Sequence, residues 1–267
     1  MSSYPNLISN SVLISDTIAL LESSTGPVTV VDIVDSIMKI SRPEPNFAKL
    51  LVSDLIQIDP RLKFSDELTV ELVPCDFDSR VLSETDFVVF DVETTGAKVP
   101  PCRITEIGAF RVSGGKIVAE YQTLINPLMP IPVFISELTG ISDEMVRSAP
   151  EFHEIADEFL EFVGDSVLVA HNAQFDIRFI NHEIGKVFDG YRLGNPHLCT
   201  VQLSRRLLPD IDNHRLHTVA DYYSITIENR HRAGDDALAT AKIFVEFLQR
   251  FAEDGISDLQ SLNRLNN

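Results

Sequence analysis

The 267-residue sequence predicts an α/β protein, in which helices cover a mixed sheet, preceded by a smaller and mainly helical unit. Three observations support this fold class. Three strand-like apolar runs follow one another at 87–93, 103–112 and 118–125. Strand and helix patterns then alternate as far as residue 251. Ahead of them, helical spacing dominates up to a polar, proline-containing joint at 73–85.

The first unit, placed at 1–80, is predicted to contain three short helices and a hairpin. Apolar residues recur at helical spacing over 11–24, 33–40 and 46–57, with Gly-Pro and Pro-Glu-Pro breaks between them. Two alternating runs within 61–73 are separated by a polar turn, as in a hairpin. This order of elements resembles a winged helix-turn-helix.

The charge of this unit bears on its function. Residues 1–80 hold six Lys and Arg against twelve Asp and Glu. The candidate recognition helix offers only Lys49, offset by Asp54, whereas groove binding requires cations that face phosphate. Three roles remain open for this unit: docking to a protein, a structural role, and duplex binding. The first two are favoured.

The second unit, placed at 85–250, is justified element by element. Gly114-Gly115 between the second and third strands is a hairpin signal. A helix stripe at 152–163 precedes a short buried strand at 167–170, and a helix follows through 175–184. The last predicted helix covers about 234–251, and residues 251–267 are assigned as a C-terminal tail.

Composition excludes several classes of protein. The sequence is 44% hydrophobic and 23% charged, which is ordinary for a soluble globular protein, and no apolar run approaches a membrane span of about 18 residues. The N-terminus lacks the features of a signal peptide. Three widely spaced cysteines predict a reducing, cytoplasmic compartment without disulfides or a zinc site. The net charge of −18 disfavours anionic membranes and, at first sight, nucleic acid.

The first strand carries two carboxylates where a covered strand should be apolar. Val89, Asp91 and Glu93 alternate along one face, and their neighbours are all apolar. Unpaired buried carboxylates are costly, so they require either salt bridges or another cation, and no basic residue follows before Lys98. The small polar turn Thr94-Thr95-Gly96 comes next, and it would allow a ligand to approach the backbone.

Two helix starts carry further acids. In the segment that begins at His171, Asp176 shares a helix face with Phe179 and Ile180, so it points towards the sheet unless it only complements the helix dipole. Asp236 lies in the first turn of the last helix, five residues after His231. Four carboxylates and a histidine would therefore converge.

This set of residues suits metal-dependent hydrolysis of a phosphate ester. Oxygen ligands select hard cations such as Mg²⁺ or Mn²⁺. Two such ions suit in-line displacement at phosphorus, and a neutral histidine can take the proton of the attacking water.

The motifs resemble those of a known family, the DnaQ-like (DEDDh) 3′–5′ exonucleases, which include the proofreading epsilon subunit of bacterial DNA polymerase III. The matching segments are Asp91-Val-Glu-Thr-Thr-Gly96, His171-Asn-Ala-Gln-Phe-Asp176 and His231-Arg-Ala-Gly-Asp-Asp236-Ala. Secondary features agree at Ile104–Ala109, Ile125–Pro127 and Leu138–Ser142. The resemblance covers about residues 85–250 and implies a ribonuclease-H-like sheet with two divalent metal ions.

The resemblance also assigns roles to residues. It implies that Asp91, Glu93, Asp176 and Asp236 are metal ligands, with Asp91 as the bridge, and that His231 is the general base. Thr94, Thr95 and Gly96 would hold the terminal nucleotide through backbone and hydroxyl contacts to its sugar.

Other positions have two open interpretations. Leu138 is either a wedge against the terminal base or a core residue, and Phe175 either lines the nucleotide pocket or belongs to the core. Asn172 either contacts substrate or caps its helix. We take Glu106 as structural, Asp235 as solvated or structural, and His171 as support for the fold in preference to a phosphate contact.

The implied activity is 3′–5′ hydrolysis of single-stranded DNA ends to nucleoside 5′-monophosphates, in proofreading or repair. A 3′–5′ exoribonuclease is the alternative, because nothing in the sequence reads a 2′-hydroxyl. The roughly ninety residues before the first motif depart from familiar epsilon subunits and resemble the front of proteins that join this nuclease to a GIY-YIG endonuclease, although no GIY-YIG motif is present. A third hypothesis is an adaptor that docks a polymerase or repair protein through residues 1–80.

The negative charge is uneven along the sequence. Residues 178–232 hold eight Lys and Arg against six acids and lead into His231. This segment is either a cationic track to the site or an ordinary solvated face. We therefore expect nucleic-acid contact to centre on one strand end and two metal ions, without tight binding of long duplexes.

Overall fold

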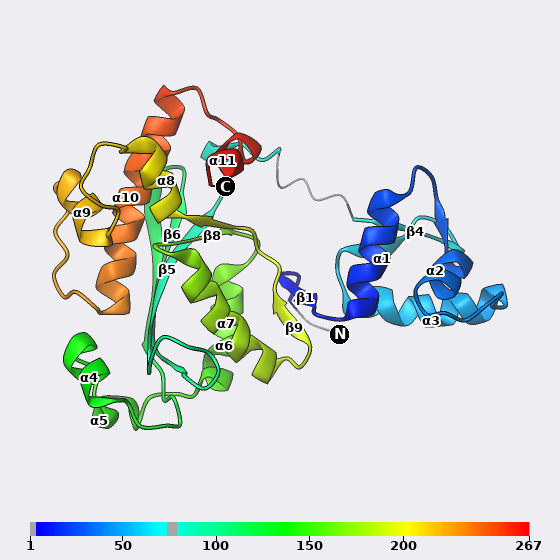
Figure 1. Cartoon of the computed structure of the whole chain (residues 1–267), viewed down its shortest axis with the longest axis horizontal. Helices are drawn as coiled ribbons and strands as arrows, with labels where there is room; N and C mark the ends of the chain where they lie inside the picture. Colours follow the sequence, from blue (N-terminus) through cyan, green and yellow to red (C-terminus); the bar gives the residue numbers. More distant parts are fainter. Residues whose placement is uncertain (1–3, 74–78, 267) are drawn as a thin grey trace. The chain divides into compact units, whose positions relative to one another are not determined.

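The computed structural model describes residues 4–73 and 79–266, and the chain divides into two compact units (Figure 1). The first unit comprises residues 1–75 together with 188–194, and the second comprises 76–187 together with 195–267. Residues 74–78 of the predicted joint lie outside the described residues. Among the described residues, none of the helices combines the length and apolar character that crossing a membrane requires.

The first unit has a core of its own. Its elements are β1 (Leu7–Ser9), α1 (Val12–Ser23), β2 (Val28–Thr29), α2 (Val30–Ser36), α3 (Pro45–Ile58), β3 (Leu62–Phe64) and β4 (Thr69–Leu72). Ile14 of α1, Val34 of α2 and Val52 of α3 pack together in that core. The three antiparallel strands have the order β2-β4-β3. The three helices and the hairpin therefore occur in the order that the sequence predicts, while the assignment as a winged helix stays a prediction.

Local sequence signals explain where two of these helices begin. Thr29 and Asp32 form a reciprocal capping box at the start of α2. Pro45 occupies the first turn of α3, and the carboxylate of Glu44 accepts a hydrogen bond from the Phe47 N–H at 3.0 Å.

A short segment from the second half of the sequence also belongs to the first unit, which the domain limits 1–80 and 85–250 do not allow for. Strand β9 (Tyr191–Leu193) pairs antiparallel with β1. The buried carboxylate of Asp59 accepts a hydrogen bond from the Ser9 N–H at 2.9 Å and forms an ion pair with Arg61 at 2.8 Å. No pattern in the sequence predicts this pairing, because β1 and β9 are too short for their periodicity to be recognised.

The second unit is built on a five-stranded mixed sheet. Its strands are β5 (Phe87–Thr94), β6 (Ile104–Ser113), β7 (Lys116–Leu124), β8 (Val167–Ala170) and β10 (His197–Cys199), in the order β10-β8-β5-β6-β7. Strands β5, β6 and β7 form an antiparallel meander, and β8 is parallel to both β5 and β10. β5 is therefore the central strand, as the apolar residues on either side of its two carboxylates predict.

Helices cover the sheet, as expected from the sequence (Figure 1). They are α4 (Val133–Thr139), α5 (Asp143–Val146), α6 (Phe152–Val163), α7 (Ala173–Val187), α8 (Thr200–Leu207), α9 (Leu216–Tyr222), α10 (Ala233–Glu253) and α11 (Leu259–Asn266), with a short 3-10 helix η1 at Leu82–Glu84. On one face, Phe87 of β5 packs against Phe244 of α10, with ring centroids 4.9 Å apart. On the other, Tyr121 of β7 packs against Phe159 of α6.

Residues 251–266, which belong to the segment predicted as a C-terminal tail, are part of this packing. Helix α10 continues to Glu253, and α11 places the fully buried Leu259 and Leu262 in the main core. The Leu82 N–H donates to the Ser257 carbonyl at 2.8 Å. This segment therefore closes the core beside η1.

Candidate active site

The centre of the site is the end of β5. Asp91 and Glu93 share the face that α10 covers, since Phe87 and Val89 of the same parity pack in the core with α10. Asp91 lies opposite Gly108 of β6, and Glu93 lies opposite Glu106. The register shifts between Glu93 and Thr94, so the pairing of β5 with β6 is irregular at the end of the strand that carries the two carboxylates.

Asp176 reaches this strand because β8 ends early. β8 pairs with β5 only as far as Val89, and the chain then turns into α7. The Val92 N–H is therefore free of a strand partner on that side, and it donates to Asp176 Oδ1 at 3.2 Å. Asp176 is only 3% exposed. This hydrogen bond places the Asp176 carboxylate beside Val92, the residue between Asp91 and Glu93.

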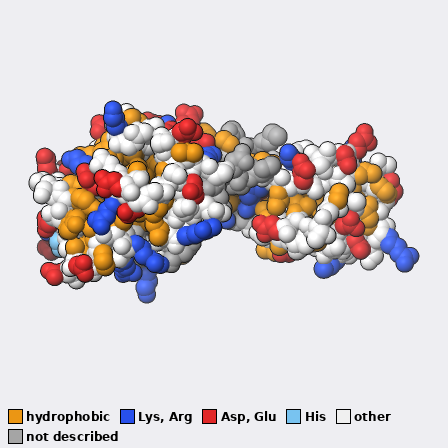
Figure 2. Space-filling model, turned by 90° about the horizontal axis from the view of Figure 1, so that it is seen from above, with side chains coloured by type: hydrophobic (Ala, Val, Ile, Leu, Met, Phe, Trp, Pro, Cys, Tyr) orange, Lys and Arg blue, Asp and Glu red, His pale blue; other side chains and the backbone are white. Residues whose placement is uncertain are grey.

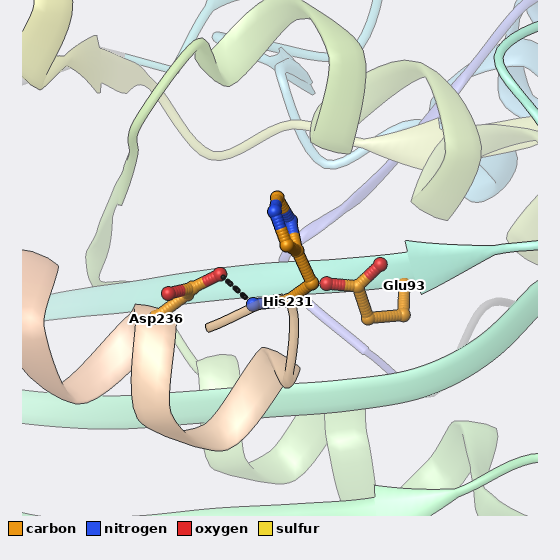
Figure 3. A group of neighbouring side chains, drawn as sticks. All are labelled: Glu93, His231 and Asp236. Carbon is orange, nitrogen blue, oxygen red and sulfur yellow. Dashed lines mark hydrogen bonds between the residues drawn. The ribbon is translucent and has the colours of Figure 1, made fainter. Parts of the chain in front are cut away.

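The start of α10 supplies the third group of side chains (Figure 3). The His231 N–H donates to Asp236 Oδ2 at 3.0 Å, and His231 adopts a left-handed backbone conformation with φ of 60°. One ligand atom from each of Glu93, His231 and Asp236 lies within 4.8 Å of the others. This trio joins Glu93 of β5 to two neighbouring residues at the start of α10.

The start of α10 is fixed against β6 by a contact that sequence reasoning did not identify. Glu106 forms an ion pair with Arg232 at 2.6 Å and also accepts a hydrogen bond from the Ala233 N–H at 2.9 Å. Gly108 permits the close approach, because a Cβ at this position would collide with the backbone of Ala233 and Gly234. The pair links positions 126 residues apart, and no local pattern predicts it.

A second ion pair fixes α7. Arg103, just before β6, binds Glu183 of α7 through two hydrogen bonds of 2.5 and 2.7 Å. The Glu183 side chain is 2% exposed. Glu183 lies two turns after Asp176 on the same helix face, so this pair holds the face that carries the Asp176 carboxylate.

The electrostatics of the site are those of crowded, desolvated acids. We call four residues the acidic cluster: Asp91, Glu93, Asp176 and Asp236. Burial, together with the charges of Asp236 and Glu106, raises the pKa of Glu93 from 4.5 to about 8. Burial and the neighbouring acids raise the pKa of Asp91 well above its usual value. Burial likewise raises the pKa of Asp176 and of Asp236, although backbone hydrogen bonds oppose both shifts.

This donor set fits a divalent cation. Among residues 4–73 and 79–266, no Lys or Arg forms an ion pair with a member of the acidic cluster. Carboxylate oxygens that repel one another in a partly buried site are ligands for hard cations. A bound cation would replace mutual repulsion with attraction and would lower each raised pKa.

Comparison with known proteins identifies the domain. Residues 88–244, more than half of the chain, match the exonuclease family. The chain belongs to this family. Within it, the similarity is to the DnaQ-like DEDDh exonucleases, so this is a hydrolase. The match extends from β5 to α10 and includes all four positions of the acidic cluster.

Two kinds of bacterial polymerase protein are similar to this exonuclease. A DNA polymerase III subunit epsilon from Aquifex aeolicus is 39% identical over 69% of this chain and 91% of its own length. A DNA polymerase III PolC-type from Caldanaerobacter subterraneus is 42% identical over 70% of this chain, but only 13% of that protein is covered. The chain therefore spans a small part of its PolC-type relatives.

Solved structures share the fold. Exonuclease X, solved in complex with 5′-overhanging duplex DNA, is 25% identical and superposes with a TM-score of 0.53 over 68% of this chain and 99% of its own. E. coli Exonuclease I, solved with a dT13 oligonucleotide, has a TM-score of 0.56 at 16% identity over 64% of this chain and 42% of its own.

The predicted substrate turn of the exonuclease is internally bonded. The Thr94 hydroxyl donates to the Gly96 carbonyl at 2.9 Å, and the Thr95 hydroxyl accepts a hydrogen bond from the Arg103 N–H at 3.0 Å. Both threonines are buried, and a Cβ at Gly96 would lie 2.9 Å from Cys102 Sγ. Sugar contacts through these hydroxyls would compete with existing bonds, so the backbone offers the easier route to a nucleotide.

The remaining predicted residues differ in exposure. Leu138 on α4 is 50% exposed, which is inconsistent with the core interpretation and leaves the wedge interpretation as a prediction. Phe175 is half-buried, and its ring centroid is 4.8 Å from that of Phe179. Asn172 is exposed, with φ of 82°. His171 uses both ring nitrogens, with the Thr200 hydroxyl at 2.9 Å and the His214 carbonyl at 3.0 Å, and burial lowers its pKa to about 4.

Proposed function

We propose that this exonuclease hydrolyses phosphodiester bonds from the 3′ end of single-stranded DNA and releases nucleoside 5′-monophosphates. The observation that carries the proposal is the approach of Glu93, His231 and Asp236 to within 4.8 Å of one another beside the half-buried Asp91 and the buried Asp176. A carboxylate cluster next to an exposed imidazole provides both ligands for cations and a proton acceptor.

Each side chain has a proposed part in the reaction. The acidic cluster would hold two divalent ions, Mg²⁺ or Mn²⁺, which supply water activation and stabilisation of the leaving oxygen. His231 is exposed and takes the proton of the attacking water as general base. The hydrogen bond from its N–H to Asp236 fixes its position relative to the cluster.

The substrate end would be held by neighbouring elements. The turn Thr94–Gly96 binds the terminal nucleotide, Leu138 contacts its base, and Phe175 and Asn172 at the start of α7 line the other side. DNA is preferred over RNA in this proposal, because the relatives that are 39% and 42% identical are named as DNA polymerase III proteins. Proofreading beside a polymerase and repair of strand ends are both compatible with this chemistry.

The test uses matched DNA and RNA strands labelled at either end, with Mg²⁺ or Mn²⁺. We expect a stepwise ladder from the 3′ end of DNA, with slower degradation of RNA. Asp91→Asn and His231→Ala should each lower the rate by more than about 100-fold, since even partners of metal ligands contribute about 10–100-fold.

Asp235→Asn is the matched control. Asp235 lies beside Asp236 and bonds Asn229 at 3.0 Å, so this variant should retain the ladder. A ladder that is unchanged by Asp91→Asn would show that another protein causes the activity. Faster degradation of RNA would replace the DNA proposal with the exoribonuclease alternative.

We also propose that the first unit docks a protein rather than DNA. On α3 it exposes Phe47 and Leu50, which are 46% and 62% accessible, whereas Lys49 is the one cation of that helix. Exposed apolar residues beside few cations fit a protein partner, such as a polymerase or repair protein, better than a phosphate backbone.

A further inference from the structure

We propose that a pocket beside the catalytic histidine holds one nucleotide of the bound strand, separate from the terminal nucleotide at the acidic cluster. The pocket has a volume of about 630 Å³ and is lined by His217, Asp221, Ser224, Ile225, Thr226, Ile227 and Arg230. Its size lies within the range of small-molecule sites, about 300–1,000 Å³. The inference rests on the proposed function, because it concerns the same strand.

The pocket is joined directly to the catalytic segment. Helix α9 provides its first two lining residues, and the loop from α9 to α10 provides the others. Figure 1 shows this loop running down alongside α10 to the helix start. Arg230 immediately precedes His231, so their Cα atoms lie about 3.8 Å apart. The pocket wall therefore continues, within one residue of the chain, into the trio of Glu93, His231 and Asp236.

The walls of the pocket are held in place. The Ile225 N–H donates to the Ala220 carbonyl at 2.9 Å, which closes the turn after α9. Tyr223 packs on Phe247 of α10, with ring centroids 6.0 Å apart. Asn229 donates to Asp235 in the first turn of α10 at 3.0 Å. The loop is thus fixed to the helix that carries the catalytic Asp236.

The lining matches the three parts of a nucleotide. Ile225 and Ile227 offer apolar surface to a base, and Thr226 offers a hydroxyl that can bond a sugar. Arg230 supplies a full positive charge, and His217 supplies a ring nitrogen, for a phosphate.

Asp221 distinguishes the two sources of a nucleotide. Its negative charge repels a phosphate group, and the repulsion grows with the charge of that phosphate. A free monophosphate carries about −1.5 to −2, whereas a phosphodiester within a strand carries a single charge, so the free monophosphate is repelled more strongly. The pocket therefore suits a nucleotide within a strand better than the released product.

His217→Ala is the decisive variant, because His217 lies on α9 and not beside the catalytic histidine in sequence. With a ten-nucleotide DNA strand we expect its KM to rise about tenfold while kcat changes less than about twofold, as for loss of one charge-assisted hydrogen bond. Asp221→Asn should lower KM about two- to threefold. With p-nitrophenyl thymidine 5′-monophosphate, which has a single nucleotide, both variants should match the wild type.

Two further measurements complete the test. Fluorescence anisotropy with a labelled strand should show the same tenfold loss of affinity in His217→Ala, whether or not the protein is active. Arg206→Ala, an exposed arginine of α8 outside the pocket, serves as the control and should leave both KM and affinity unchanged.

Three outcomes would overturn the pocket proposal. One is an unchanged KM and affinity for the strand in His217→Ala, and another is an equal loss on both substrates. The third is that thymidine 5′-monophosphate inhibits His217→Ala more weakly than the wild type, while the KM for the strand is unchanged. That result would assign the pocket to the free product. The wild-type protein could also prove inactive while His217→Ala still weakens binding of the strand. That result would contradict the proposed function but support the pocket.

Discussion

At the scale of single residues, the site is under electrostatic strain that its ligands would relieve. Glu93 and Asp236 lie within 4.8 Å of each other, and burial removes the water that would separate their charges. In the metal-free protein, the ordinary outcome of such crowding is proton uptake, which is why the pKa of Glu93 rises to about 8. Function and stability therefore oppose each other at these positions.

This opposition predicts a pH dependence of stability. The pKa of Glu93 is higher in the folded protein, about 8, than its ordinary value of 4.5, so the folded state binds more protons between these values. The free energy of unfolding of the metal-free protein should thus fall as pH rises from about 4.5 to about 8. Urea denaturation at several pH values in EDTA measures it.

Glu93→Gln is the control for this prediction. It removes the titrating group, so the variant should lose less stability over the same pH range than the wild type. Addition of Mg²⁺ should restore stability to the wild type at high pH, because binding to the folded state alone stabilises it. Equal pH slopes for both proteins would contradict the assignment to Glu93.

The acids that gather at the end of β5 could be singled out from the sequence, but the contacts that fix them could not. Asp91 and Glu93 are conspicuous because carboxylates interrupt an apolar strand. The supporting pairs, Glu106 with Arg232 and Arg103 with Glu183, join residues 126 and 80 positions apart. Each member looks like an ordinary charged residue within its own segment, so only the tertiary structure reveals the pair.

At the scale of elements, the position of α10 over β6 depends on a glycine, which has no side chain to hold the helix away from the strand. Gly108 lies under Ala233 and Gly234, and it is the strand neighbour of Asp91. Gly108→Ala should push the start of α10 outward and move Asp236 away from Asp91. We expect kcat to fall by about 100-fold, since a displacement of about 1 Å in a catalytic constellation has that effect.

Steady-state kinetics on a labelled DNA strand measure the effect of Gly108→Ala. Gly26→Ala is the control, because a Cβ at Gly26 meets no atom within 4 Å. The proposal of a close helix contact would be wrong if Gly108→Ala kept wild-type kcat. Far-UV circular dichroism should show that the variant remains folded.

The position of α7 gives a separate prediction. Arg103→Met leaves the Glu183 carboxylate, 2% exposed, without its cation, and should lower the free energy of unfolding by about 3 kcal/mol. The double variant Arg103→Met with Glu183→Leu should recover most of that loss, because no buried charge remains. Urea denaturation of the two single variants and the double variant measures the coupling. Strictly additive losses would show that the two side chains act independently.

The longest elements were predictable, and several of the shortest were not. The stripe of Phe152, Ile155, Phe159 and Val163 identifies α6, and the alternating run before Gly114 identifies β6. The strands β1, β9 and β10 have three residues each, too few for a period to appear. The sequence predicts only a tail after residue 251, whereas Leu259 and Leu262 of α11 are fully buried.

At the scale of the whole molecule, a net charge of −18 has to be reconciled with binding a polyanion. On the face shown in Figure 2, acidic and basic side chains are interspersed rather than gathered into one cationic field. The acidic cluster accounts for four of the negative charges, and two divalent ions would cancel them locally. Binding should therefore depend on the metal and on a few phosphate contacts.

Salt dependence tests this view of the whole protein. If two to four phosphates are contacted, a plot of log affinity for single-stranded DNA against log salt concentration should have a slope between about −1 and −3. Fluorescence anisotropy of the Asp91→Asn and wild-type proteins, each with and without Ca²⁺, measures the affinity without extensive hydrolysis. Ca²⁺ should raise the affinity of the wild type for single-stranded DNA more than that of Asp91→Asn. Separately, Lys49→Glu in α3 should leave the affinity for duplex DNA unchanged. A slope steeper than about −5, or loss of duplex binding in Lys49→Glu, would instead indicate an extended cationic track with the first unit as part of it.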